Sequence, residues 1–115
     1  MGSADDLADM PADDAGSVEA ATLADLEDAT RVRLFEGEPR AVRLALAAGE
    51  TIPSHSHPER QIVCHVLEGH LEITLSGTEH GVEAGQLLRF DGEEEIALEA
   101  LEDSVAVLVL APRAD

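Results

Sequence analysis

Residues 49–69 read GETIPSHSHPERQIVCHVLEG, and this stretch decides how the rest of the chain is interpreted. His55 and His57 stand one residue apart, a few residues ahead of the apolar run 62–67. Alternate side chains of that run form two faces, and this period of two is typical of a β-strand. Glycines end the stretch on both sides and indicate turns. The sequence therefore predicts a β-strand at residues 62–67, with the histidine pair just before it.

Further short strands are predicted on both sides of this stretch. Apolar side chains alternate with polar or small ones, and turn residues recur about every 8 to 12 residues, which indicates an all-β barrel or sandwich. We therefore expect one β domain over residues 31–111. Its predicted strands lie near residues 32–34, 42–46, 62–67, 71–75, 86–90, 96–100 and 105–110.

The N-terminal part of the chain has a different composition. Residues 1–17 contain five Asp, no basic residue and few large apolar side chains. Such a segment cannot bury enough apolar surface to offset the entropy of ordering, so we expect a disordered acidic tail. Residues 18–30 hold too few apolar side chains for a stable amphipathic helix. We expect them to form a lead-in segment that lies across the domain.

Charge and composition exclude several classes of function. The chain has 115 residues and a formal net charge of −18, and all seven basic residues are Arg. Binding of nucleic acid or of an anionic membrane requires clustered basic residues, so neither partner is expected. No apolar run reaches the roughly 20 residues of a membrane-spanning helix. The single cysteine, Cys64, cannot form an internal disulfide, which fits a cytoplasmic protein.

The absence of Lys has two explanations. A carboxylate-rich surface without Lys resembles proteins of salt-loving organisms that keep molar salt inside the cell. There the Debye length falls to about 3 Å, which screens the repulsion among carboxylates. A GC-rich genome in an ordinary bacterium would also replace Lys with Arg. The sequence favours a halophilic origin and leaves the alternative open.

Two segments of this chain resemble the motifs of the cupin superfamily. The first motif runs glycine, five residues, His-x-His, three or four residues, Glu, six residues, glycine. Residues 49–69 match both glycines and both histidines. The second motif is degenerate, because Asp91 stands at its proline and Ile96 at its histidine. The resemblance, to small single-domain cupins, covers about residues 31–111 and implies a jelly-roll β-barrel, often dimeric, with an internal pocket.

The resemblance also implies a metal site, and this chain departs from it. Cupin metals are held by the two histidines and glutamate of the first motif and the histidine of the second. His55 and His57 match, whereas the glutamate position falls on Gln61 or, by the spacing to the closing glycine, on Ile62. Ile96 stands at the fourth position. We therefore predict at most a weak site for Zn, Fe, Mn, Ni or Cu at His55, His57 and Gln61, and we assign no catalytic residue.

Three functions remain open. The first is a small cupin that binds a small molecule, a weakly held divalent metal, or both. The second is a metal-dependent enzyme of the dioxygenase or isomerase type that uses His55 and His57. The third is a non-catalytic, dimeric interaction domain. Under the first, apolar pocket walls are predicted from Ile62, Cys64, Val66, Leu71, Ile73, Ile96 and Leu98.

The cysteine and the histidines outside the motif positions are expected to have no catalytic or metal-binding role. Cys64 lies on the apolar strand face and is expected to be a small buried hydrophobe. His65 alternates with Cys64 and is expected to point away from the barrel interior. His70 and His80 lie near turns and are expected to be solvated.

Overall fold

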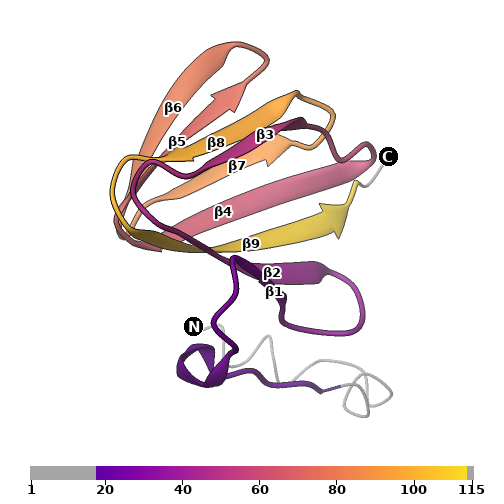
Figure 1. Ribbon diagram of the computed structural model, residues 1–115. Helices are drawn as coiled ribbons and strands as arrows, with labels where there is room; N and C mark the ends of the chain where they lie inside the picture. The colour runs from indigo at the N-terminus through magenta and orange to yellow at the C-terminus, as the bar shows by residue number, and fades with distance from the viewer. Residues whose placement is uncertain (1–17, 114–115) are drawn as a thin grey trace, which may run out of the picture.

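The computed structural model describes residues 18–113, so the predicted tail, residues 1–17, lies outside the described residues. The lead-in segment, residues 18–30, contains one short 3₁₀ turn, Leu23–Asp25, and no other regular element. It lies below β1 and β2 in the view of Figure 1. Arg43 attaches it to the domain by donating from Nη2 to the carbonyl oxygens of Glu27 and Ala29.

The domain is built of nine antiparallel strands in two sheets, which confirms the expected all-β jelly-roll fold. The five-stranded sheet has the order β1-β2-β9-β4-β7 and the four-stranded sheet the order β3-β8-β5-β6. Figure 1 shows the strands arranged around one interior. The strands are β1 (Arg31–Arg33), β2 (Arg40–Leu46), β3 (Thr51–His55), β4 (Arg60–Glu68), β5 (His70–Leu75), β6 (Thr78–Glu83), β7 (Leu87–Asp91), β8 (Ile96–Ala100) and β9 (Ser104–Pro112).

Two strands, β3 and β6, were not predicted from the sequence. Both lie at the edges of the four-stranded sheet, where only one neighbour is needed. Their sequences, TIPSH and TEHGVE, are polar and contain proline or glycine. Edge strands tolerate such residues because part of their main chain bonds to no neighbouring strand. Tertiary pairing therefore overrides the weak local strand preference in these two segments.

The core lies between the inner faces of the two sheets. Alternation along β4 buries Ile62, Cys64 and Val66, and leaves the intervening side chains on the outer face. The side chains of Leu71 and Ile73 on β5 meet them from the other sheet and are at most 1% exposed. Burial of these aliphatic groups is the main source of stability expected for a domain of this size.

Residues 18–113 contain no helix that is long and apolar enough to cross a membrane.

Candidate functional site

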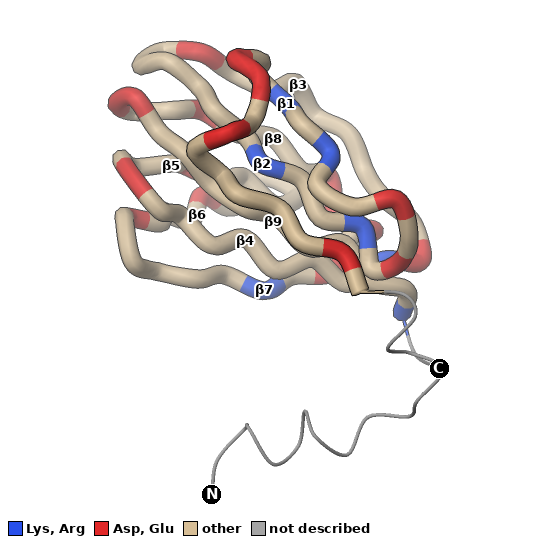
Figure 2. The backbone as a smooth tube through the Cα atoms, turned by 90° about the horizontal axis from the view of Figure 1, so that it is seen from below, with Lys and Arg blue, Asp and Glu red and all other residues tan. Residues whose placement is uncertain are grey.

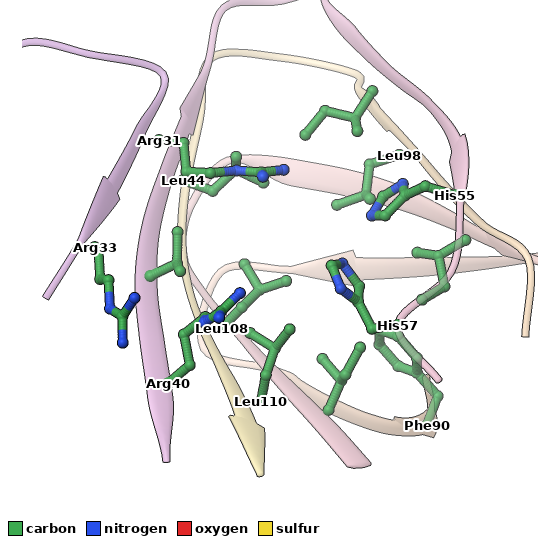
Figure 3. Close-up of a pocket in the computed structure, with 14 residues that line it drawn as sticks. Arg31, Arg33, Arg40, Leu44, His55, His57, Phe90, Leu98, Leu108 and Leu110 are labelled. Carbon is green, nitrogen blue, oxygen red and sulfur yellow. The ribbon is translucent and has the colours of Figure 1, made fainter. Parts of the chain in front are cut away.

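A pocket of about 350 Å³ opens into the interior between the two sheets. This volume lies at the lower end of the range typical of small-molecule sites. The pocket walls are mostly aliphatic, and its polar groups are three arginines and two histidines (Figure 3). The lining residues are Arg31, Arg33, Arg40, Val42, Leu44, Ile52, His55, His57, Ile62, Phe90, Ile96, Leu98, Leu108 and Leu110.

A bulge in β3 places His55 in the pocket. In a regular strand, residues three positions apart point to opposite faces, yet Ile52 and His55 both line the pocket. The pairing of β3 with β8 shifts register between these two residues, and a bulge of this kind restores the inward direction. Pro53 lies within the shift, where its ring does not interrupt a regular ladder.

The turn between β7 and β8 positions His57. The main-chain N–H of His57 donates to the carbonyl oxygen of Gly92 over 2.7 Å, and Gly92 N–H donates to the carbonyl oxygen of Arg60. Gly92 is buried, and a Cβ at this position would collide with the carbonyl oxygen of His57. Only glycine lets the two segments approach this closely, so Gly92 fixes the main chain that carries His57.

The two imidazoles form a pair with defined lone-pair positions. Their ring centroids are 4.9 Å apart and their planes are nearly perpendicular, at 87°. His55 Nδ1 lies 3.0 Å from the carbonyl oxygen of Pro53, so the proton of the neutral ring sits on Nδ1 and the lone pair on Nε2. Burial lowers the pKa of His57, and the positive charges of His55 and Arg31 lower it further. His57 is therefore a neutral imidazole at neutral pH.

Three arginines that the sequence does not mark as site residues form the opposite wall. Arg31 and Arg33 of β1 pair with Leu44 and Val42 of β2, whose side chains point into the barrel. Paired residues share a face of the sheet, so both arginines belong to the inner face. Arg40 lies two residues before Val42 and shares that face. Figure 3 shows Arg31 and Arg40 extending from this wall toward the histidines.

The structure separates the predicted ligand residues. His55 and His57 both line the pocket, together with Ile62 and Ile96. Gln61 does not line it, because Gln61 alternates with Ile62 on β4 and belongs to the outer face. Of the two candidate positions for the motif glutamate, Ile62 lies in the pocket, and Ile62 is the position that the spacing to Gly69 favours. An isoleucine there cannot bind a metal.

The other expectations for single residues have mixed outcomes. Cys64 is fully buried, which confirms the expectation of a small hydrophobe, and burial raises the pKa of its thiol to about 12. His65 belongs to the outer face of β4, as expected. His70 and His80 are half-buried rather than solvated, because each packs within the β5–β6 pair.

The expected pocket walls are partly wrong. Ile62, Ile96 and Leu98 do line the pocket. The other four predicted wall residues do not line it, because they are buried within the packed hydrophobic core. These residues are Cys64, Val66, Leu71 and Ile73.

The donor set does not fit a tightly held metal of the cupin type. Within residues 18–113, no group of three or more His, Cys, Asp or Glu side chains is placed to hold a metal ion. Two imidazoles without a carboxylate supply no negative charge to offset a divalent cation. The guanidinium groups of Arg31 and Arg40 add positive charge to the same pocket. Two imidazoles can hold Zn²⁺ or Cu²⁺ only weakly in this setting.

Comparison with protein families gives one match, to the cupin domain, over residues 42–112. The match spans more than half of the chain, and the two-sheet barrel with its internal pocket agrees with it. The chain therefore belongs to the cupin family. Comparison with curated proteins gives no match.

Similar solved structures share this fold. A conserved protein of unknown function from Streptococcus pyogenes is 27% identical, with a TM-score of 0.60 over 71% of this chain and 73% of that one. KdgF from Halomonas sp. is 23% identical, with a TM-score of 0.65 over 74% and 79%. An RmlC-like cupin protein from Desulfovibrio desulfuricans is 24% identical, with a TM-score of 0.70 over 84% and 99%.

Proposed function

We propose that this protein binds a small molecule in its barrel pocket and holds a divalent metal there weakly at most. The observation that supports this most directly is the pocket itself, whose apolar walls surround a few convergent polar groups. That combination is the usual composition of a small-molecule site. The apolar walls would bury the body of the ligand, and the histidines would orient its polar part.

The two histidines suit this role because each can present an acceptor nitrogen. In the neutral ring of His55, Nδ1 donates to the carbonyl oxygen of Pro53 and leaves Nε2 as an acceptor, while the lowered pKa of His57 keeps that ring neutral. Neutral imidazoles accept a hydrogen bond from a ligand hydroxyl or amide. Since Gly92 and the β3 bulge fix both side chains from the main chain, the ligand would meet preorganised partners.

A metal-dependent enzyme of the dioxygenase or isomerase type is the second candidate. One observation favours it, namely the close pair of imidazoles with Nε2 of His55 free to bind a metal. This candidate requires ligands from solvent or substrate to complete the metal shell, because the chain supplies only two imidazoles. It predicts stoichiometric metal in the purified protein.

Metal analysis separates the two candidates. Untagged protein prepared in high salt without chelator would be analysed by inductively coupled plasma mass spectrometry. The double variant His55→Ala/His57→Ala tests the site, and His65→Ala on the outer face of β4 is the matched control. We expect well below one metal per chain in all three. Near-stoichiometric metal that disappears only in the double variant would replace our proposal with the enzyme.

Ligand-observed and protein-observed NMR test the binding function directly. The chain has five His, two Phe and no Tyr or Trp, so its aromatic spectrum is sparse and the ring signals of His55 and His57 can be followed individually. A library of small polar and apolar fragments should give ligands that shift these two signals and leave that of His65 unchanged. A library without such ligands, on well-folded protein, would contradict the proposed function.

A further inference from the structure

Positive charge is scarce in this chain, and the fold concentrates it at the pocket. Seven arginines stand against 25 acidic residues, and three of the seven line the pocket. Figure 2 shows the basic positions of β1 and β2 grouped along one side of the barrel. Within residues 18–113, no Asp or Glu side chain lines this pocket. The pocket thus carries a charge opposite in sign to that of the whole chain.

Two of these arginines have donors available for a ligand. Arg33 donates to the carbonyl oxygens of Phe35 and Glu36 and is engaged by its own loop. Among the described residues, neither Arg31 nor Arg40 forms a salt bridge or a side-chain hydrogen bond. Both side chains line the pocket, so their guanidinium groups can donate to an acceptor that arrives with a ligand.

The nearby carboxylate is bonded mainly to another arginine. Glu38, which follows the β1 strand, receives two hydrogen bonds from the guanidinium of Arg60. These bonds are the largest cause that lowers the pKa of Glu38, and the charge of Arg40 is a smaller one. Arg113 is likewise paired, with Asp91 and Glu93. The structure therefore satisfies these two arginines with carboxylates of the chain and leaves Arg31 and Arg40 facing the pocket.

We propose that the ligand is a small organic carboxylate, held by Arg31 and Arg40 with its apolar body against the aliphatic walls. This inference rests on the proposed function and specifies its ligand class. A guanidinium matches the two oxygens of a carboxylate in a bidentate geometry. Arg31 is largely exposed and Arg40 is half-buried, so the charged group lies near the mouth, and the buried walls behind it select an apolar body.

A charged and a neutral probe of the same shape test the proposal. Hexanoate and hexanamide would be titrated into full-length protein at constant ionic strength, because salt screens exposed charges. Binding is measured from the ring signals of His55 and His57. We expect hexanoate to bind at least tenfold more tightly than hexanamide. Inorganic phosphate is the third probe, and we expect it to displace hexanoate poorly because it has no apolar body.

Two matched variants connect the preference to the pocket. Arg31→Gln/Arg40→Gln removes both charges and should weaken hexanoate binding at least tenfold without changing that of hexanamide. Arg89→Gln removes a charge from the exposed side of β7 and should leave both affinities unchanged. The amide spectrum of each variant checks its fold.

The outcomes distinguish the ligand class from the pocket function. Equal binding of hexanoate and hexanamide, unaffected by Arg31→Gln/Arg40→Gln, would overturn the carboxylate proposal and support the pocket as a neutral site. Phosphate that competes as well as hexanoate would also overturn it, in favour of a general anion site. Failure of both six-carbon probes to shift the histidine signals would overturn the carboxylate proposal. If the fragment library also gave no ligand, the proposed function would fall with it.

Discussion

One end of this barrel is closed by hydrogen bonds, and the other end opens into the pocket. At one end, the segments that enter β5 and β9 are tied together by main-chain and side-chain hydrogen bonds around Ser104 and Gly69. At the other end, where Arg40 and Ile96 lie, the pocket opens, and the Arg31 and Arg40 side chains line it without a salt bridge to any described residue. The closed end is held by hydrogen bonds within the chain, and the polar groups of the open end are those to which we assign the proposed ligand.

The closed end is packed so tightly that one position accepts no side chain. Gly69 has a φ of +87°, and a Cβ there would collide with the carbonyl oxygen of Asp103 and the hydroxyl of Ser104. Ser104 is 3% exposed, accepts a hydrogen bond from the N–H of His70 over 3.0 Å, and donates to the carbonyl oxygen of Glu102. Hydrogen bonds and close contact therefore hold Gly69, His70 and Ser104 in place.

The largest effect is therefore expected for Gly69→Ala. The substitution combines an unfavourable positive φ with a collision against main chain, and we expect it to lower the free energy of unfolding by about 2–5 kcal/mol. Gly77→Ala is the matched control, because Gly77 has a φ of +91° and nothing within 4 Å of the added Cβ. It should cost only about 1–2 kcal/mol. Urea unfolding measures both free energies. Equal losses in the two variants would show that the main chain around Gly69 shifts to accommodate a methyl group at little cost.

A smaller effect is expected for Ser104→Ala. The change leaves the N–H of His70 without its acceptor in a half-buried place, which should cost about 1–3 kcal/mol. Ser76→Ala removes a hydroxyl that also makes two hydrogen bonds, but on the exposed surface. Water can replace those bonds, so that variant should change stability by less than about 0.5 kcal/mol. Similar losses in the two variants would contradict the special role of the closed end.

The closed end and the core were largely predictable from sequence, and the open end only in part. Alternation along residues 62–66 identified the inward face of β4, because burial of a period-two pattern depends only on neighbouring residues. The same rule failed for Cys64 and Val66 as pocket residues. How far a cavity extends depends on the distance between two sheets, and no local pattern encodes that distance.

Alternation along the sequence does not identify which histidines and arginines face the pocket. His55 and His57 were found through a motif, although alternation alone would have turned His55 away from Ile52, because the bulge between them is invisible in the sequence. Arg31 and Arg33 were missed because charged residues that alternate with apolar ones are normally assigned to the solvent side. The pairing of β1 with β2 decides the matter by placing both arginines on the face of Leu44 and Val42. The alternation of Arg31 and Arg33 with Val32 is equally compatible with arginines that face the barrel interior and a valine that faces outward.

The smallest expected effect concerns the charge of the open end itself. Burial, followed by the charges of His55 and the arginines, keeps the pKa of His57 below its ordinary value of 6.5. In Arg31→Gln/Arg40→Gln, the pKa of His57 should rise but stay below 6.5, since burial is the first cause and persists. Titration of the His57 ring signal by NMR measures this directly, and Arg89→Gln should leave the pKa unchanged.

The lowered pKa of His57 also makes the free energy of unfolding depend on pH. Unfolded chains bind the His57 proton more readily than the folded protein does, so this contribution to stability is complete above about pH 6.5 and is lost as the pH falls below it. Because Arg31→Gln/Arg40→Gln brings the folded pKa closer to the unfolded one, the acid-induced loss should be smaller in that variant. Urea unfolding at pH 7.5 and pH 5 compares the variant with wild type. An identical loss in the two proteins would mean that the guanidinium charges do not reach His57, and it would remove the electrostatic contrast between the two ends of the barrel.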